Sequence, residues 1–183
     1  EPDAAAIFLK NGVPATGSLL RNPGLATTLE AIGRDGRQGF YEGPTAQALA
    51  SYAKQHGGFF TEEDLHAQRA QWDAPLVGHY RDLTLYQTPA PTQGFTVLEM
   101  LNLLEPYALE KTGFLSADHV HFLVQAKQIA YHDRDRFLAD PAFADVPMAR
   151  LISKKYADER RTLIDPQRAL AWDKVPSYGS LTG

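Results

Sequence analysis

The sequence predicts an α+β fold that is mainly helical and contains one β-hairpin. Apolar residues recur at helical spacing behind helix-capping residues over most of the chain, and only the stretch after Pro75 changes to the alternation that is typical of strands. The 183 residues are 44% hydrophobic and 22% charged, which is the balance of a globular domain with a sizeable core. We therefore expect a single domain over residues 1–183.

Helix start and stop signals predict six helices. They run over 23–34, from Pro44 to Gly57-Gly58, from Thr61 to about Ala70, from Thr92 or Thr96 through Leu104, from Ser116 to Asp140-Pro141, and from about Ser153 to Leu163. Asn22 before Pro23 places a capping side chain next to a proline at the first helical position. Thr61 and Asp64 form a near capping box, with Asp in place of the usual Glu or Gln.

The helix that follows Ser116 is the longest, and we expect its apolar stripe to form the core of the chain. The stripe consists of Val120, Leu123, Val124, Ala130, Tyr131 and Phe137. A hairpin is predicted between Pro75 and Pro89-Ala90-Pro91, with its turn near Arg81-Asp82. Its apolar residues, which alternate with polar or small ones, are Leu76, Tyr80, Leu83 and Leu85. Residues 173–180 have the composition of a loop.

Composition argues against several classes of partner. No apolar run approaches the roughly 18 residues that span a bilayer, and the first residues lack the basic start and the apolar stretch of a signal peptide. The formal net charge is -4, and the scattered Lys and Arg residues form no basic stripe for a nucleic acid. Without cysteine the chain can form neither a disulfide framework nor a zinc knuckle. We expect no membrane and no nucleic acid as partners.

Three histidines in the longest predicted helix, His119, His121 and His132, are candidates for a metal site. Residues two apart point to different faces of a helix. A rise of 1.5 Å per residue places His132 about 16 Å along the axis from His121, whereas zinc needs its nitrogen ligands at about 2 Å. The spacing therefore predicts solvated or hydrogen-bonded histidines, no metal site and no cofactor.

Ser51-Tyr52-Ala53-Lys54 matches the serine and lysine spacing of penicillin-recognising enzymes, and Lys111-Thr112-Gly113 matches their later tripeptide. The serine-aspartate-asparagine element of those enzymes is missing, and Lys111 precedes a glycine turn instead of lying on a strand. We interpret the match as coincidence. The sequence also contains no phosphate loop, glycine-rich dinucleotide turn or Gly-x-Ser-x-Gly elbow.

The densest run of charge, residues 132–136, lies near the end of the longest predicted helix. Its last arginine can meet Asp133 and Asp140 at helical spacing, which favours a solvated helix end. Lys127 and Arg134 lie close to the apolar stripe, where a buried cation needs a partner carboxylate. Two alternatives stay open for them: they reach another part of the fold, or they meet something absent from this chain.

Several segments, taken in order, resemble the large subunit of γ-glutamyltranspeptidases. Gly12-Val13-Pro14 with Gly17, and Leu25-Ala26-Thr27-Thr28-Leu29, are similar to the family's Gly-x-Pro-x-x-Gly and Leu-Ala-x-Thr-Leu stretches. Phe40-Tyr41-Glu42-Gly43 with Ala46 is similar to its Phe-Tyr-x-Gly-x-x-Ala. Further matches follow in order at Gly57-Gly58, Thr61, Asp64-Leu65, Pro75, Tyr80, Gly94, Met100-Leu101-Asn102, Leu104-Glu105, Ala126-Lys127, Asp133-Arg134, Asp140-Pro141, Val146-Pro147 and Tyr156-Ala157. Together they cover nearly the whole chain.

The resemblance implies a fold and a mechanism. Members of the family form the stacked αββα sandwich of amino-terminal-nucleophile (Ntn) hydrolases, and their precursor cuts itself. A threonine at the new amino terminus of the small subunit becomes the nucleophile, because its free α-amino group, with a pKa near roughly 8, acts as the adjacent base. The implied reaction transfers a γ-glutamyl group from glutathione or related amides to water or an amino acid through an acyl-enzyme.

The resemblance also implies where the catalytic groups lie. The chain ends at Gly179-Ser180-Leu181-Thr182-Gly183, where family precursors approach their scissile bond, so we expect the nucleophile just after Gly183. Thr182 is followed by a single residue and is not expected to be that nucleophile. The arginine that binds the substrate carboxylate would lie upstream of Glu1, and the start without methionine also predicts a longer protein. We therefore expect no catalytic, binding or metal residue in this chain, and the small subunit as its partner.

The chain departs from the family pattern at two places. Typical transpeptidases read Pro-Pro-Ser-Ser-Gly-Gly where this chain has Ala90-Pro91-Thr92-Gln93-Gly94-Phe95, which is closer to the transpeptidase-like branch that includes acylases. Gln125 replaces a glutamic acid that is usual in the long helix.

The leading hypothesis is a structural portion of a γ-glutamyltransferase or hydrolase that is inactive alone. The alternative is a helical protein-interaction module without catalytic activity. Truncation could mimic such a module, because a sandwich that lacks its other half leaves an apolar face prone to self-association. Relatives are often periplasmic or extracellular, and for this chain the cytoplasm is left open as well. The residues beyond Gly183 would distinguish the two hypotheses.

Overall fold

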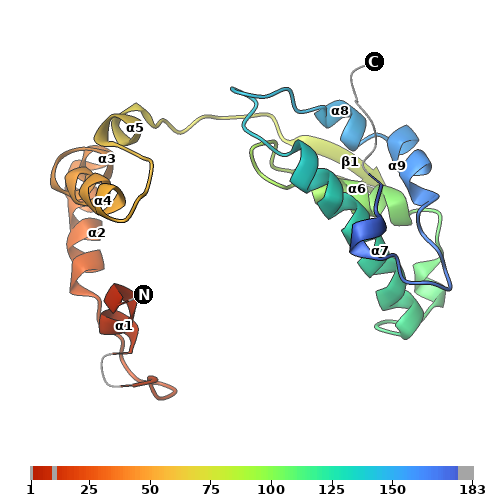
Figure 1. The fold of residues 1–183 in the computed structure, drawn as a ribbon, viewed down its shortest axis with the longest axis horizontal. Coiled ribbons are helices and arrows are strands. Elements are labelled where there is room, and N and C mark those ends of the chain that lie inside the picture. The colour runs from red at the N-terminus through yellow and green to blue at the C-terminus, as the bar shows by residue number, and fades with distance from the viewer. Residues whose placement is uncertain (1, 10–11, 177–183) are drawn as a thin grey trace. The chain divides into compact units, whose positions relative to one another are not determined.

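The computed structural model describes residues 2–9 and 12–176 (Figure 1). Its elements are α1 (Pro2–Phe8), α2 (Pro23–Asp35), α3 (Gln38–Tyr41), α4 (Gly43–Gln55), α5 (Glu62–Ala67), β1 (Leu76–Tyr80), β2 (Leu83–Gln87), α6 (Phe95–Leu104), η1 (Leu109–Lys111), α7 (Ala117–Phe137), α8 (Met148–Leu151), α9 (Lys154–Arg161) and η2 (Trp172–Lys174). The predicted fold class, mainly helical with one hairpin, is confirmed. The chain forms two compact units, Glu1–Gln71 and Trp72–Gly183. Each is described by itself, and the single domain over 1–183 stays a prediction.

The first unit is a group of short helices in which α3 contacts α2, α4 and α5. Two predicted helix starts are confirmed. The Asn22 side chain accepts a hydrogen bond from the Leu25 N–H at 3.0 Å, and Thr61 and Asp64 make both bonds of a capping box. The sequence did not predict α1 and α3, which are too short to show helical periodicity.

The helix α5 ends before Ala70, the predicted end, because a side chain from another element takes its last carbonyl groups. Arg37 donates Nη2 to the carbonyl of His66 at 2.6 Å and to that of Gln68 at 2.8 Å. The last carbonyls of a helix have no partner within the helix, and side chains commonly satisfy them. The helix therefore stops at Ala67.

Few apolar side chains of the first unit are buried. Ala46 and Ala53 on α4 are 1% and 6% exposed. Leu25 and Leu29, whose spacing predicted α2, are 53% and 57% exposed. The helix is confirmed, and its apolar face is uncovered within the described residues.

The second unit is built around α6, which contacts α7, α8, α9 and both strands (Figure 1). A helix that is surrounded in this way needs apolar residues on more than one face. Two clusters of buried apolar side chains form its core. The larger cluster contains Leu103, Leu104, Ala126, Ile129, Ala157 and Ile164, and the smaller contains Phe95, Leu151 and Tyr156.

The hairpin has the predicted position, and its turn at Arg81-Asp82 joins β1 to the antiparallel β2. Gly78 lies opposite Leu85 and against α6. A Cβ atom at position 78 would lie 2.7 Å from Leu98 Cδ2, so any larger residue here would require the Leu98 side chain to shift.

Ion pairs and hydrogen bonds join the hairpin turn to two helices. Glu105, at the end of α6, accepts the Arg81 N–H at 2.9 Å on Oε1 and the Lys154 ammonium at 2.6 Å on Oε2. Lys154 also donates to the His79 carbonyl at 2.7 Å. These contacts connect the turn, α6 and the start of α9.

The prediction that Thr92 or Thr96 caps α6 is wrong. The helix begins at Phe95 after Gly94, and Thr96 lies inside it, with Oγ1 donating to the Gln93 carbonyl at 2.8 Å. A Cβ atom at Gly94 would lie 2.5 Å from the Thr88 carbonyl oxygen. Close approach of the backbone, and not a capping side chain, therefore sets the start of this helix.

The helix α7 has the predicted cap, since Ser116 Oγ accepts the His119 N–H at 3.2 Å. The predicted apolar stripe is confirmed only in part. Ala130 is buried, and Leu123 and Phe137 pack against the two apolar clusters. Val120 and Val124 are 42% and 47% exposed. The buried residues of α7 are Gln125, Ala126, Ile129, Ala130 and Asp133. This face includes two polar residues that find partners elsewhere in the fold, and a search for apolar residues alone could not indicate them.

The chain after α7 contains one predicted helix and two short elements. Ser153 caps α9 by accepting the Tyr156 N–H at 3.1 Å, as its position predicted. The sequence did not predict α8. The turn η2 overlaps the start of the predicted loop 173–180, and residues 177–180 of that loop lie outside the described residues. None of the helices in the described part of the chain combines the length and the apolar composition needed to cross a membrane.

Candidate functional site

A buried polar cluster lies between α6, α7 and α9 in the second unit, and we call Glu99, Asp133, Tyr156 and Arg160 the polar cluster. Arg160 forms a two-pronged ion pair with Asp133, through Nε to Oδ2 at 3.1 Å and Nη2 to Oδ1 at 2.9 Å. The Tyr156 hydroxyl donates to Asp133 Oδ2 at 2.9 Å. Each of the four residues is at most 1% exposed.

Helix geometry places these side chains together. Tyr156 and Arg160 are four apart on α9, so both lie on the face that meets Asp133 on α7. Burying a charge costs free energy unless it is paired and hydrogen-bonded. The Asp133 carboxylate meets that condition with three hydrogen bonds, and loss of one partner would leave a buried charge that costs several kcal/mol, roughly 3–5.

Glu99 on α6 adds a second carboxyl to the polar cluster. Its pKa is raised well above its usual range by burial and then by the charge of Asp133, while Arg160 acts in the opposite direction. Neither carboxyl oxygen has a hydrogen-bond partner among the described residues. With one arginine and two carboxyls, the polar cluster favours the protonated form of Glu99. Burial and the Asp133 charge also raise the pKa of Tyr156, so its hydroxyl remains a donor.

The polar cluster also holds the end of the described chain. Arg160 Nη1 donates to the carbonyl of Pro176 at 2.9 Å, and the preceding residue, Val175, is 5% exposed. The guanidinium therefore spans α7, α9 and the last described residues.

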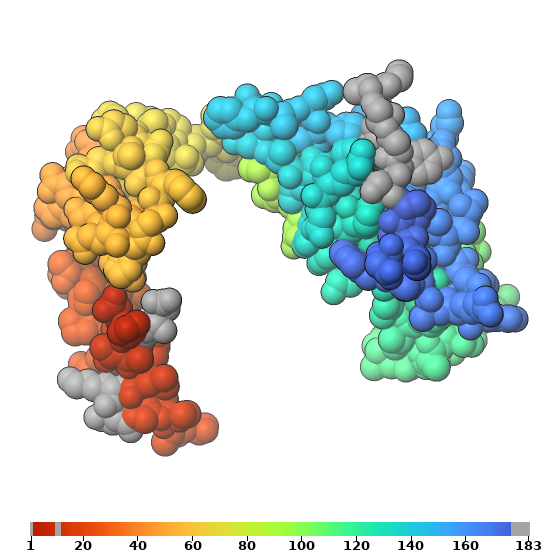
Figure 2. Space-filling model, viewed as in Figure 1, coloured from red at the N-terminus to blue at the C-terminus, as the bar shows by residue number. Residues whose placement is uncertain are grey.

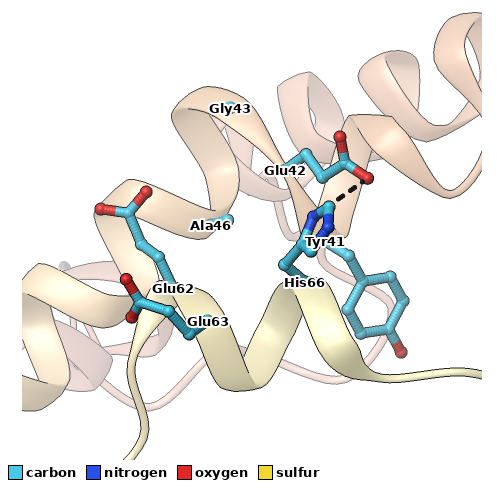
Figure 3. A pocket seen from close by; sticks show the side chains of 7 residues that line it. All are labelled: Tyr41, Glu42, Gly43, Ala46, Glu62, Glu63 and His66. Carbon is cyan, nitrogen blue, oxygen red and sulfur yellow. Dashed lines mark ion pairs between the residues drawn. The ribbon is translucent and has the colours of Figure 1, made fainter.

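A second feature is a hollow of about 360 Å³ in the first unit. Figure 3 shows the side chains that line it, which are Tyr41, Glu42, Gly43, Ala46, Glu62, Glu63 and His66. Glu42 Oε1 lies 2.8 Å from Arg37 Nη1 and 3.5 Å from His66 Nδ1. Glu62 and Glu63 stand in the first turn of α5, where the helix dipole favours acidic residues. Helix structure thus accounts for these carboxylates, and no described group of three or more His, Asp or Glu could hold a metal ion.

The residues that match the penicillin-recognising pattern fall in different compact units. Ser51 and Lys54 are exposed on α4 of the first unit, whereas Lys111 belongs to η1 of the second. Thr182, which was not expected to be the nucleophile, lies outside the described residues. The absence of catalytic residues from this chain stays a prediction.

The three histidines contact different groups. His121 Nε2 lies 2.7 Å from the Asp165 carbonyl. His132 Nδ1 lies 3.8 Å from Asp133 Oδ1. His119 Nδ1 is buried without a hydrogen-bond partner among the described residues, and its ring meets that of Phe114 edge to face.

The structure gives the contacts of Lys127 and Arg134, the two cations for which the sequence left two alternatives open. Arg134 reaches another part of the fold, where its Nη1 donates to Gln93 Oε1 at 3.0 Å. Lys127 and Arg134 also lie over the Tyr131 ring, at 5.0 and 4.2 Å from its centroid. Arg134 also has a partner carboxylate, since its Nη2 lies 2.6 Å from Asp135 Oδ1, whereas Lys127 is exposed and has the cation–π contact.

Gln125, a departure from the family pattern, pairs with the backbone of Asp165 in both directions. Its Nε2 donates to the Asp165 carbonyl at 2.9 Å, and its Oε1 accepts the Asp165 N–H at 3.1 Å. A carboxylate could accept from the N–H but could not donate to the carbonyl. The amide therefore fits this backbone segment better than an ionised glutamate.

Sequence reasoning missed Glu99, Tyr156 and Arg160 as members of the polar cluster. It identified Asp133 and proposed a partner within the same helix, whereas Arg160 is the observed partner. The one signal that could have pointed to it is the pair Tyr156 and Arg160 at i,i+4 on a helix that is otherwise strongly charged.

A sequence model of gamma-glutamyltranspeptidase matches residues 1–182. The chain belongs to the gamma-glutamyltranspeptidase family. Among curated relatives, it is 40% identical over 159 residues to the glutathione hydrolase-like YwrD proenzyme of Bacillus subtilis (strain 168), a match that covers 86% of this chain and 30% of that protein. It is 40% identical over 181 residues to the acylase ACY 1 proenzyme of Pseudomonas sp. (strain SE83), which covers 98% and 32%.

Solved structures of the gamma-glutamyltranspeptidase family show the same fold. A Helicobacter pylori gamma-glutamyltranspeptidase superposes with a TM-score of 0.81 at 30% identity, covering 99% of this chain and 53% of that one. A cephalosporin acylase from Bacillus halodurans gives 0.74 at 30% identity, covering 88% and 30%. The chain thus spans about a third of its curated relatives, and the alternative of an unrelated interaction module is not favoured.

Proposed function

We propose that the chain is the later part of the large subunit of a γ-glutamyltranspeptidase-like Ntn hydrolase whose nucleophile follows Gly183. The observation that carries this proposal is the family match over residues 1–182. Two further findings support it. The matched relatives are named proenzymes, and this chain covers about half of the Helicobacter pylori chain.

The proposed reaction is acyl transfer. The amine of an amino-terminal threonine takes the proton of its own hydroxyl as the oxygen attacks the γ-carbonyl of glutathione or a related amide. The leaving amine departs with a proton, and an acyl-enzyme ester remains. Water or the amine of an amino acid then attacks the ester and releases glutamate or a new γ-glutamyl amide.

This chain contributes structure to that enzyme. Its helices and hairpin would form part of an αββα sandwich that the small subunit of the same precursor completes. A threonine inside a chain lacks the α-amino group that serves as base, so residues 1–183 should be inactive alone. The relatedness to acylase proenzymes leaves the acyl donor to be measured.

An assay with a γ-glutamyl anilide tests the proposal. We expect the full-length precursor to cleave itself and then release the anilide's amine, and the 183-residue chain to release none. The matched control is the precursor in which the threonine expected after Gly183 is replaced by alanine, which should neither cleave nor turn over. Turnover by the isolated chain, or self-cleavage by that control, would overturn the proposal.

A further inference from the structure

Arg160 ties the end of the described chain to a fixed point inside the second unit. Its Nε and Nη2 hold Asp133, and its Nη1 donates to the Pro176 carbonyl at 2.9 Å. The Arg160 side chain is fully buried, and its bond to Pro176 is partly buried. In Figure 2 the residues that lead to Pro176, in dark blue, lie on the second unit.

The orientation of the guanidinium is determined by its neighbours. Asp133 takes two of its nitrogen atoms, and the Tyr156 hydroxyl holds the same carboxylate at 2.9 Å. An arginine fork presents its donors in one plane and in fixed directions. The nitrogen that remains on the far side of the fork is therefore aimed at Pro176 by contacts that α7 and α9 supply.

The chain before Pro176 is held as well. Leu170 packs against the larger apolar cluster, the residues 172–174 form the turn η2, and Val175 is 5% exposed. The path from the core to Pro176 is thus fixed at successive points. From there, residues 177–183 can extend at most about 25 Å.

We propose that Arg160 is a positioning residue for self-cleavage of the precursor, because it fixes the point from which the chain continues to the scissile bond. This inference rests on the proposed function. In the cleavage step, the threonine hydroxyl oxygen bonds to the carbonyl carbon of Gly183, and the amide C–N bond breaks as the nitrogen takes the proton. Water then hydrolyses the ester to a Gly183 carboxylate and the free hydroxyl.

Such a step depends strongly on placement. Misplacement of the reacting atoms by about 1 Å can lower a rate by as much as roughly 100-fold. After cleavage, Gly183 is a free chain end, and the hydroxyl acts on a separate substrate. Loss of the anchor should therefore slow cleavage and leave turnover by the cleaved enzyme unchanged.

The test uses the full-length precursor with Arg160→Lys. A lysine keeps a charge for Asp133, but its single amine cannot reach Asp133 and Pro176 together. We expect self-cleavage to slow by about tenfold or more, with kcat and KM of the cleaved enzyme for a γ-glutamyl anilide equal to the parent's. Val175→Ala loosens the same anchor without touching the ion pair, and it should slow cleavage in the same direction.

Arg161→Lys is the matched control. Arg161 follows on the same helix and donates to the carbonyls of Leu103 at 2.9 Å and Asn102 at 2.8 Å, so its substitution perturbs α9 without touching Pro176. We expect it to cleave within about twofold of the parent rate. Thermal unfolding of all variants shows which are folded, and Val175→Ala carries the test if Arg160→Lys is not.

Three outcomes separate the possibilities. Cleavage of folded Arg160→Lys and Val175→Ala at the parent rate would overturn the anchor, and so would equal slowing by Arg161→Lys, because the effect would then be general destabilisation. A loss of kcat in the cleaved Arg160→Lys enzyme would also overturn it. A parent precursor that never cleaves itself would instead refute the proposed function.

Discussion

Glu99 is a carboxyl residue whose burial and charged neighbour both disfavour its ionised form. Its side chain is fully buried beside Asp133, and both conditions raise the pKa of its carboxyl. The unfolded chain loses this proton near its usual pKa of about 4.3, while the folded chain keeps it to higher pH. Compared with a variant that has a neutral side chain at position 99, the parent therefore has its full stability below the unfolded pKa of Glu99. It loses stability as the pH rises from there through the folded pKa.

Glu99→Gln should remove this pH dependence. We expect the variant to match the parent near pH 4 and to unfold at an increasingly higher temperature as the pH rises above about 4.3, until the difference becomes constant above the folded pKa of Glu99. The slope of the difference can reach at most about 1.4 kcal/mol per pH unit. Thermal unfolding of the full-length protein from pH 4 to pH 9 measures it, and a difference that does not change with pH would contradict the expectation.

Gln125 gives a second prediction at this scale. Gln125→Met keeps the length of the side chain but leaves the Asp165 N–H without its hydrogen bond at a site where residue 125 is 1% exposed. We expect a loss of about 1–3 kcal/mol. Gln128→Met on the same helix, where the side chain is half-buried, is the control and should change stability by less than about 0.5 kcal/mol. Urea unfolding measures the free energy of unfolding of both variants. Equal losses in the two would contradict the role of Gln125 as the hydrogen-bond partner of Asp165.

At the scale of elements, local signals predicted the helices that have side-chain caps. Asn22, Thr61, Ser116 and Ser153 each accept the expected backbone N–H, because a cap depends on residues within one turn. The start of α6 was not predictable in this way. It depends on the approach of Gly94 to the Thr88 carbonyl, which arises only when the hairpin and the helix are both in place.

The same close approach of elements at Gly78 can be tested. Gly78→Ala would place a methyl group 2.7 Å from Leu98 Cδ2, and Leu98 is itself only 2% exposed. We expect a loss of about 1–3 kcal/mol from overpacking. Gly33→Ala is the control, because nothing lies within 4 Å of its Cβ position, and an alanine inside α2 should stabilise by about 0.5–1 kcal/mol. Equal effects of the two substitutions on unfolding would refute the packing argument.

At the scale of the whole molecule, the sequence predicted the family better than the interior. The resemblance spread over the chain, so it did not depend on knowing any contact. The pairing of Asp133 with Arg160 did depend on one, because no local pattern relates a residue on α7 to one on α9. The polar residues on the buried face of α7 were missed for the same reason: Gln125 and Asp133 are buried because distant groups satisfy them.

The exposed apolar residues support a last prediction. The largest exposed fractions among them are 103% for Trp72, 98% for Phe59 and 90% for Phe143, and the chain spans only about a third of its curated relatives. Exposed apolar side chains bind other apolar surfaces when the part of the protein that covers them is missing. We expect residues 1–183 produced alone to sediment above the 20.2 kDa of one chain and to bind a hydrophobic dye. The full-length precursor is the control and should bind much less dye per molecule. A monodisperse 183-residue monomer that leaves the dye unbound would show that these side chains need no cover from the rest of the protein.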